Sequence, residues 1–377
     1  MTDNRGTLLG RVWNPTARGP SVVTVRDGVV YDITSVQAPL VRDICEMDDP
    51  VAYVQKAEGT RLCSLDELLA NDPSNAEKPY LLAPCDLQAV KACGVTFANS
   101  MLERVIEEQA AGDPKKAESI RKNITDVVGS SLRNLKPGSE EAGKVKEALT
   151  AEGMWSQYLE VGIGPDAEVF SKAQVLSSVG YGAEVGLHPI SNWNNPEPEA
   201  VLTVTSQGRI VGATLGNDVN LRDVEGRSAL LLSKAKDNNA SCSIGPFIRL
   251  FDDSYSLDDV RNMELQLTVK GPDGFVLDGY SSMNMISRDP EDLVSQTIGR
   301  HHQYPDGLVL FLGTLFAPTK DRDVPGEGFT HKVGDIVTIS NPALGSLVNT
   351  VNLSTECAPW TFGTRELIAN LASRKLI

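Results

Sequence analysis

Short β-branched segments separated by Gly, Pro and Asn fill the chain from about residue 159 onward, and this texture limits the fold more than any other feature. The clearest segments are 201–205, 210–214, 264–269, 308–312, 336–340 and 346–351. Beyond residue 159, helical patterns are found only at 289–298 and 364–371. Because strands dominate and do not alternate with helices, we expect a β-rich α+β fold.

The first 80 residues are predicted to form a small unit of their own. Residues 21–34 contain two β-branched runs around Asp27-Gly28, which predicts a hairpin. Ser64 and Glu67 form a capping box at the start of a short helix, and the polar stretch 70–79 follows as a linker. A length of 377 residues suits two domains. We therefore expect a smaller N-terminal α/β domain over 1–80 and a larger domain over 81–377.

A helical region is expected near the start of the larger domain. The pattern is helical from about 100 to 111 and again over 114–151, with a break at Lys136-Pro137-Gly138-Ser139. This predicts two helices that form an insertion over about 112–151.

The charge and the cysteines exclude several classes of protein. The chain carries 35 Lys and Arg against 50 Asp and Glu, a formal net charge of −15. This argues against nucleic acid and against an anionic membrane surface, since both need basic patches. The longest apolar stretch, 308–316, is too short to span a bilayer, and the first ten residues lack the apolar region of a signal peptide. The six cysteines contain no C-x-x-C pair, so we expect reduced thiols in a cytoplasmic protein.

Acidic side chains are the best candidates for chemistry. The four histidines have no zinc-site spacing, and no G-x-S-x-G motif is present. Glu197 and Glu199 lie two residues apart, hence on one side of an extended segment. A hairpin turning at Gln207-Gly208 would place Glu197 opposite Asp218. Three such carboxylates suit Mg²⁺, Mn²⁺ or Ca²⁺, and the alternative is that all three are solvated surface acids.

Two further groups could act as acids or bases. Lys234 and Lys236 follow an apolar run, and one of them could point into a carboxylate site. Desolvation and a nearby cation would lower the pKa of that lysine, which could then serve as a general base or acid. The alternative is a solvated lysine in a loop. Glu103 and Glu107 lie one helical turn apart, with Ser100 on the same stripe. Ser100 and Glu103 also fit an ordinary capping box.

Taken together, these motifs resemble the fumarylacetoacetate hydrolase superfamily, in the family's order and over roughly residues 81–377. The matching segments are Gly94-Val-Thr-Phe97, Glu197-Pro-Glu199, Gly216-Asn-Asp-Val-Asn-Leu-Arg-Asp223, Lys236 nine residues before Gly245-Pro246, Gly313-Thr314 and Lys332-Val-Gly-Asp335. The resemblance implies a family-like C-terminal domain, a mixed β-sandwich or roll. It also implies metal binding by Glu197, Glu199 and Asp218, and substrate binding by Phe97, Arg222, Gly313 and Thr314.

Within the superfamily, the chain looks most similar to the 2-keto-3-deoxy-pentonate dehydratases. The resemblance rests on six segments: Gly94-Val-Thr-Phe-Ala-Asn-Ser100, Leu102-Glu-Arg-Val-Ile-Glu-Glu108, Trp155-Ser-Gln-Tyr-Leu-Glu160, Asn192-Trp-Asn-Asn-Pro-Glu-Pro-Glu199, residues 228–239 and His302-Gln-Tyr-Pro-Asp-Gly307. The hydrolases carry a histidine that activates water in their first helix, and no histidine lies between residues 94 and 111 here. This departure argues against hydrolysis.

The resemblance implies a reaction and its partners. The substrate would be a 2-keto-3-deoxy-pentonate, first of all 2-keto-3-deoxy-D-xylonate, dehydrated to 2,5-dioxopentanoate in oxidative pentose breakdown. Lys236 would remove the C3 proton, and Glu103 would protonate the leaving hydroxyl with Glu107 or Ser100 as helper, or the two roles would be exchanged. The cofactor would be a divalent cation, Mg²⁺ before Mn²⁺ or Ca²⁺, in a homo-oligomer. The alternatives are a hydrolase or decarboxylase of a diketo or oxo acid, and a non-catalytic sugar-acid binding protein.

Overall fold

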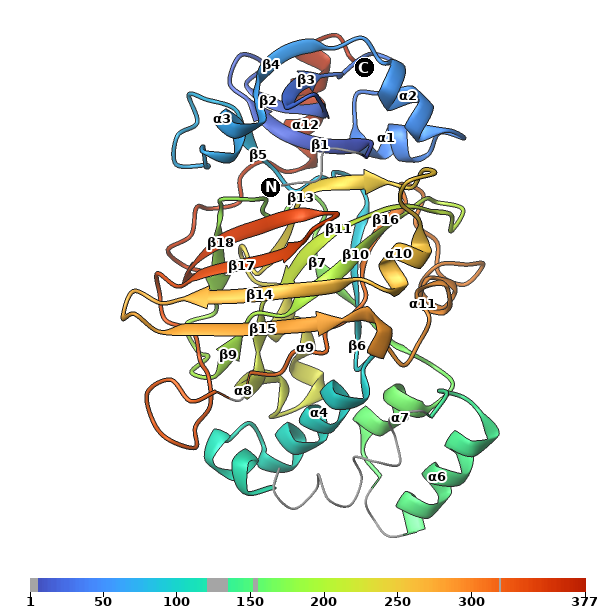
Figure 1. The fold of residues 1–377 in the computed structure, drawn as a ribbon, viewed down its shortest axis with the longest axis vertical. Coiled ribbons are helices and arrows are strands. Elements are labelled where there is room, and N and C mark those ends of the chain that lie inside the picture. Colours follow the sequence, from blue (N-terminus) through green and yellow to red (C-terminus); the bar gives the residue numbers. More distant parts are fainter. Residues whose placement is uncertain (1–5, 121–134, 152–154, 319) are drawn as a thin grey trace.

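Two large sheets form the body of the protein, as a computed structural model shows for residues 6–120, 135–151, 155–318 and 320–377 (Figure 1). The larger sheet has the order β4 (Thr60–Ser64), β3 (Val29–Asp32), β2 (Gly19–Arg26), β1 (Leu8–Asn14), β13 (Cys242–Leu250), β11 (Ile210–Asp218), β10 (Pro198–Val204), β16 (Leu308–Phe311), β6 (Ala89–Gly94) and β7 (Glu168–Ala173), with β5 (Tyr80–Leu81) paired to β1. The smaller sheet has the order β15 (Val276–Ser282), β14 (Glu264–Lys270), β17 (Ile336–Asn341), β18 (Gly345–Leu353) and β8 (Glu184–Leu187). A two-stranded ladder joins β9 (Asn194–Asn195) to β12 (Asn220–Leu221).

Short helices surround these sheets. They are α1 (Val41–Cys45), α2 (Pro50–Lys56), α3 (Leu65–Leu69), α4 (Ala98–Ala110), α6 (Glu140–Ala151), α7 (Gln157–Ile163), α8 (Arg222–Glu225), α9 (Leu232–Lys236), α10 (Leu257–Arg261), α11 (Pro290–Thr297) and α12 (Thr364–Ser373), with 3₁₀ turns η1 (Ala229–Leu231) and η2 (Met283–Met285). The expected β-rich α+β fold is confirmed. In the described part of the chain, no helix is long and apolar enough to cross a membrane.

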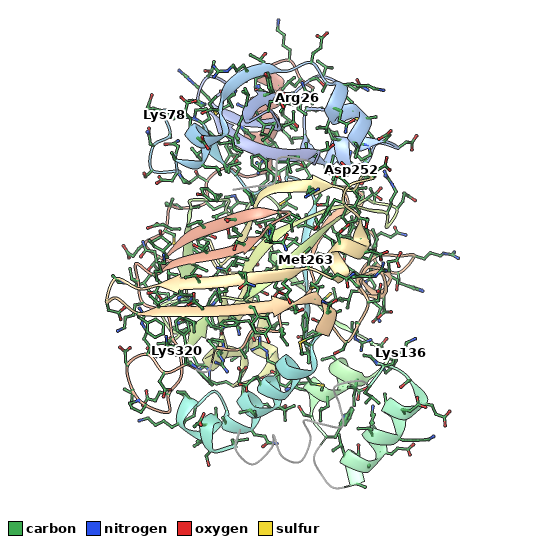
Figure 2. All side chains as sticks on the ribbon, viewed as in Figure 1. Arg26, Lys78, Lys136, Asp252, Met263 and Lys320 are labelled. Atoms are coloured by element: carbon green, nitrogen blue, oxygen red, sulfur yellow. The ribbon has the colours of Figure 1, made fainter. Side chains whose placement is uncertain are left out.

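The main hydrophobic core lies between the two sheets. Leu202 and Leu215 from the larger sheet belong to the same buried cluster as Leu267 and Ile339 from the smaller one. Met263, labelled in Figure 2, precedes β14 and is buried in this cluster too. The alternation of buried and exposed residues along β14 and β17 fits a sheet with one buried face. The two sheets therefore pack face to face as the predicted sandwich.

The N-terminal strands extend the larger sheet. β1 pairs with β13, with Leu9 opposite Ile248, so β1–β4 are continuous with β13, β11 and β10 in one sheet. The predicted hairpin is present as β2 and β3, where Asp27 and Gly28 have φ of 50° and 74°. The capping box of Ser64 and Glu67 is also confirmed. The domain boundary near residue 80 stays a prediction.

Helices gather at the end of the sandwich opposite the N-terminal strands, where Figure 1 shows α4, α6 and α7. α4 confirms the helix expected over 100–111, and α6 lies in the second half of the predicted insertion. The rest of that insertion falls partly on 121–134, outside the described residues. α4 packs against α7 through Met101, Val105 and Leu159. α4 lies beside the end of the larger sheet that is farthest from the N-terminal strands (Figure 1).

Candidate active site

Three buried carboxylates come together at the start of β10 and the end of β11. Pro198 pairs with Asn217, and the N–H of Asp218 donates to the Glu197 carbonyl at 3.1 Å. The predicted register, with Glu197 opposite Asp218, is thus confirmed. A bulge between Thr203 and Val204 shifts only the residues nearest the turn. Because strand side chains alternate, Glu199 points to the same side as Glu197.

The carboxylates of Glu197, Glu199 and Asp218 form a compact oxygen cluster. One oxygen of each lies within 4.8 Å of the other two. The three residues are 7%, 2% and 1% exposed, respectively, which excludes the alternative of solvated surface acids. Burial, together with the neighbouring Asp218 and Glu197, raises the pKa of Glu199 well above its usual value.

Two buried lysines neutralise part of this charge. Lys236 Nζ lies 3.1 Å from Glu197 Oε2, 3.1 Å from Asp218 Oδ2 and 3.2 Å from Glu225 Oε1. Lys172 Nζ lies 2.8 Å from Asp218 Oδ1. Burial alone would lower the pKa of Lys236, but Asp218, Glu197 and Glu225 outweigh it and raise that pKa well above its usual value. Lys236 is therefore a protonated lysine whose ammonium group holds three carboxylates.

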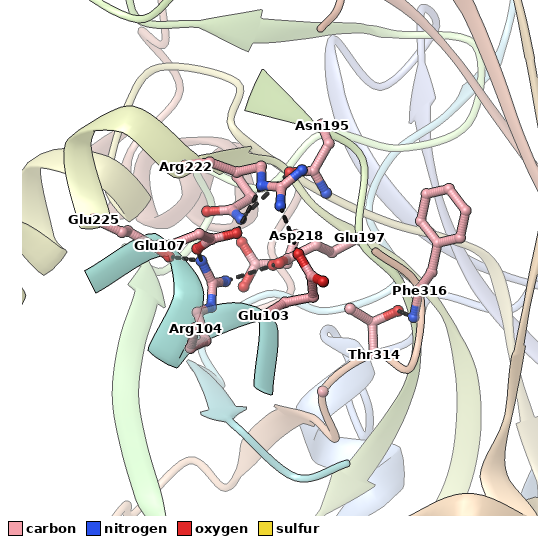
Figure 3. Close-up of polar contacts among 12 residues, drawn as sticks. Glu103, Arg104, Glu107, Asn195, Glu197, Asp218, Arg222, Glu225, Thr314 and Phe316 are labelled. Carbon is pink, nitrogen blue, oxygen red and sulfur yellow. Dashed lines mark hydrogen bonds and ion pairs between the residues drawn. The ribbon is translucent and has the colours of Figure 1, made fainter. Parts of the chain in front are cut away.

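Arg104 on α4 bridges three carboxylates. Its guanidinium lies 2.9 Å from Glu107, 2.9 Å from Glu197 and 2.5 Å from Glu225 (Figure 3). Since Glu225 also contacts Lys236, it lies between two cations. These ion pairs attach α4 directly to the carboxylate cluster.

Arg222, at the start of α8, contacts two carboxylates, a backbone carbonyl and an aromatic ring. Its Nε lies 2.7 Å from Glu107 and its Nη2 3.2 Å from Glu103, while Nη1 donates to the Pro318 carbonyl at 3.3 Å (Figure 3). The Cζ atom of its guanidinium lies over the Trp193 ring, 4.1 Å from the ring centroid. Arg222 therefore holds α4 and the loop after β16 together.

The loop after β16 supports Glu199. Gly313 donates its N–H to Glu199 Oε2 at 2.6 Å, so that N–H serves a carboxylate of the cluster. Gly313 has φ 87°, and a Cβ there would lie 2.1 Å from Thr96 Oγ1. Both facts require glycine. The Thr314 hydroxyl accepts the N–H of Phe316 at 3.1 Å, and both residues line the cavity.

Glu168 is the one carboxylate of the cavity with neither a hydrogen-bond donor nor an ion-pair partner among the described residues. It begins β7 opposite Gly94, and a Cβ on Gly94 would lie 2.0 Å from Glu168 Oε2. Burial, followed by the charge of Glu225, raises the pKa of Glu168 to about 7. A carboxyl group of that pKa can both accept and return a proton near neutral pH.

The cavity has an empty volume of about 780 Å³, counting the part open to solvent. Its lining contains seven carboxylates against three cations: Glu103, Glu107, Glu168, Glu197, Glu199, Asp218 and Glu225 against Arg104, Arg222 and Lys236. Among the described residues, no histidine or cysteine joins the three clustered carboxylates as a ligand. Oxygen ligands with an excess of negative charge fit a hard divalent cation such as Mg²⁺.

The residues predicted from the sequence are only partly brought together. Glu103, Glu107, Arg222, Lys236, Gly313 and Thr314 line the cavity with the three clustered carboxylates. Phe97, expected as a wall, is fully buried in the main core and bridges to Ile286, and it is not among the lining residues. The side chain of Ser100 lies outside the described residues.

Sequence reasoning missed Arg104, Glu168, Lys172 and Glu225. One signal for Glu168 and Lys172 was available, because β7 reads Glu-Val-Phe-Ser-Lys-Ala and alternate residues share a face. Glu225 follows Arg222 by three residues, as on one face of a helix. The pairing of Arg104 with Glu197, 93 residues away, had no signal in the sequence.

Comparison with known proteins agrees with the predicted resemblance. The family model described as fumarylacetoacetate (FAA) hydrolase C-terminal matches residues 133–352. A protein of Haloferax volcanii named probable 2-keto-3-deoxyxylonate dehydratase is 27% identical over 330 residues, 86% of this chain and 93% of that protein. The 2-dehydro-3-deoxy-D-arabinonate dehydratase of Saccharolobus solfataricus is 32% identical over 187 residues, 49% of this chain and 58% of that protein.

Solved structures share the fold. The apo form of a 2-keto-3-deoxy-D-arabinonate dehydratase superposes with a TM-score of 0.63 at 22% identity, over 92% of this chain and 99% of that one. The structure described as that enzyme complexed with magnesium and 2,5-dioxopentanoate gives 0.63 at 21% identity over the same shares. A fumarylacetoacetate hydrolase from Exiguobacterium antarcticum gives 0.57 at 16% identity, over 92% of this chain and 99% of that one. Because the family model matches more than half of the chain, this protein belongs to the fumarylacetoacetate hydrolase family.

Proposed function

We propose that this protein is a metal-dependent dehydratase that converts a 2-keto-3-deoxy-pentonate into 2,5-dioxopentanoate. The observation that carries the proposal is the buried cluster of Glu197, Glu199 and Asp218 in a cavity without a lining histidine among the described residues. The two curated relatives, whose names give dehydratases of this substrate class, support it. The sequence favours 2-keto-3-deoxy-D-xylonate as the first substrate to test.

The three clustered carboxylates would hold the divalent cation, Mg²⁺ before Mn²⁺ or Ca²⁺. When bound, such a cation polarises a 2-oxo acid and acidifies the protons at C3. Lys236, Lys172 and Arg104 hold Glu197 and Asp218 in place, and the Gly313 N–H holds Glu199.

Glu168 is the better base for the C3 proton. The sequence assigned this role to Lys236, but an ammonium group paired with three carboxylates has no lone pair to offer. Glu168 faces the cavity, and its pKa of about 7 keeps a large fraction ionised at neutral pH.

The same carboxyl group would return the proton. Once Glu168 has taken the proton from C3, it can donate it to the departing C4 hydroxyl, and the C3–H and C4–O bonds are lost as one water. Glu103, to which the sequence assigned this step, is already paired with Arg222. Tautomerisation of the unsaturated product then gives 2,5-dioxopentanoate.

The test is incubation of the protein, with Mg²⁺ and with EDTA, with 2-keto-3-deoxy-D-xylonate and its C4 epimer. We expect a product lighter by one water, oxidised by an NAD(P)⁺-dependent aldehyde dehydrogenase, and no product with EDTA. Products of carbon–carbon cleavage would instead establish a hydrolase or decarboxylase. Binding without any product would establish a sugar-acid binding protein.

Two predictions about the whole protein remain proposals, namely a homo-oligomer and a cytoplasmic location. The six cysteines, none of which forms a disulfide in the structure, support a reducing compartment. Light scattering of the purified protein measures the oligomeric state directly.

A further inference from the structure

The wall of the cavity that faces the three clustered carboxylates is built by α4 and α8, and we call it the α4 wall: Glu103, Arg104, Glu107, Arg222 and Glu225. Both of its cations are already engaged. Arg104 contacts Glu107, Glu197 and Glu225, and Arg222 contacts Glu103 and Glu107 as well as a backbone carbonyl. The α4 wall has two guanidinium groups and three carboxylates, so neither of its cations is left unpaired to bind an anionic group of a ligand.

The charge of the whole cavity points the same way. Its seven lining carboxylates and three lining cations sum to −4 when all are ionised, and Lys172 behind Asp218 reduces this to −3. A divalent cation would leave −1 before any substrate enters. The 1-carboxylate of a 2-oxo acid is offset by that cation. A second carboxylate at the other end of the substrate would enter a cavity of net negative charge, whose three lining cations are already paired with carboxylates.

A neutral acceptor at the same cavity has no partner. Asn220, on β12, is 2% exposed and lines the cavity, and its Oδ1 accepts no hydrogen bond from the described residues. A buried acceptor left unpaired costs free energy that a ligand can recover. A hydroxyl group can donate to this oxygen, whereas a carboxylate cannot.

We propose, on the basis of the proposed function, that the α4 wall selects 2-oxo acids with a neutral, hydroxyl-bearing tail and rejects those with a second carboxylate, and that Glu103 is a specificity-determining residue. Glu103 keeps Arg222 occupied and adds a negative charge where the tail of the substrate lies. Asn220 favours the hydroxylated tail.

The test compares two five-carbon ligands that differ only at C5, 2-oxopentanoate and 2-oxoglutarate. Their affinities are measured by calorimetry on the Mg²⁺-loaded protein at equal free Mg²⁺. We expect 2-oxopentanoate to bind about a hundredfold more tightly, because an uncompensated like charge in a buried site costs that order of discrimination. Equal affinities, or tighter binding of 2-oxoglutarate, overturn the proposal.

Variants assign the effect to the α4 wall. Glu103→Gln keeps the shape but removes the charge and loosens the hold on Arg222, so the ratio of affinities should fall about tenfold or more. Glu108→Gln is the matched control, since Glu108 lies on the same helix but contacts Gln157 and Ser156 outside the cavity. The ratio of the two affinities in Glu108→Gln should equal that of the unmodified protein. An unchanged ratio in Glu103→Gln, or an equal fall in both variants, overturns the role of Glu103.

This test is independent of turnover. If the ratio holds but neither epimer of the 2-keto-3-deoxy-pentonate loses water, the proposed function fails and the selectivity of the cavity stands. If the pentonates are dehydrated but the ratio is near one, the proposed function stands and the selectivity fails.

Discussion

At the scale of single residues, the environment of Glu168 decides how the reaction depends on pH. Burial and the charge of Glu225 raise its pKa to about 7. A base must be ionised to act, so we expect kcat/KM to rise with pH through this range and to level off above it. Because added positive charge favours the ionised form of Glu168, raising the Mg²⁺ concentration should move the acidic limb of the pH profile to lower pH.

Glu168→Gln should lower kcat by about 10²–10⁴-fold, remove the acidic limb and leave Mg²⁺ affinity within a few-fold of normal. The control is Glu184→Gln, a carboxylate of β8 that does not line the cavity. A Glu168→Gln enzyme with near-normal kcat would exclude Glu168 as the base.

Lys236, which the sequence predicted to be a catalytic base, is paired with three buried carboxylates and so contributes to stability. Replacing it with Met leaves Glu197, Asp218 and Glu225 buried without their shared cation. We expect a loss of about 3–5 kcal/mol in the free energy of unfolding without metal, and part of that loss should be restored by Mg²⁺. Denaturant unfolding with and without Mg²⁺ measures both quantities. Equal stability of Lys236→Met and the unmodified protein would show that the ion pairs contribute nothing.

At the scale of elements, the loop after β16 couples backbone conformation to the carboxylate cluster. Gly313→Ala would strain a φ of 87° and push a methyl group into Thr96, so the N–H that holds Glu199 should move. We expect a destabilisation of about 1–3 kcal/mol and a weaker affinity for Mg²⁺.

Gly274→Ala is the matched control for this loop. Gly274 has φ 81° in a turn where a Cβ meets nothing within 4 Å. It shares the backbone strain but not the clash, so its Mg²⁺ affinity should be normal. If both variants bind Mg²⁺ normally in calorimetry, the Gly313 loop does not position Glu199.

At the scale of the whole molecule, the two ends of the chain stabilise each other. α12 packs Leu367 and Leu371 against Leu40, and Asn370 donates to the Ala17 carbonyl at 2.9 Å. Figure 1 shows α12 among the N-terminal strands. Because β1–β4 belong to the larger sheet, a substitution that weakens the packing of α12 should reduce the stability of the whole protein. The distant carboxylate cluster should keep its geometry.

Leu371→Ala should therefore cost about 2–5 kcal/mol in the free energy of unfolding with kcat unchanged at low temperature. Ile368→Ala is the control on the same helix, since Ile368 is 53% exposed, and it should cost far less. Equal losses in the two variants would show that α12 is not anchored through this cluster.

The sequence by itself determined the fold class, the β2–β3 hairpin, the Ser64–Glu67 capping box and the register that sets Glu197 opposite Asp218. These depend on local alternation and turn chemistry, which neighbouring residues specify. The tertiary structure alone decided that Arg104 bridges to Glu197, that Phe97 lies in the core and that Lys236 is held as a cation. It also left Glu168 with neither a hydrogen-bond donor nor an ion-pair partner in the part of the chain that the structure describes. The charge state of a side chain and its access to the cavity depend on which residues, distant in the sequence, come into contact after folding. Local sequence patterns do not specify those contacts.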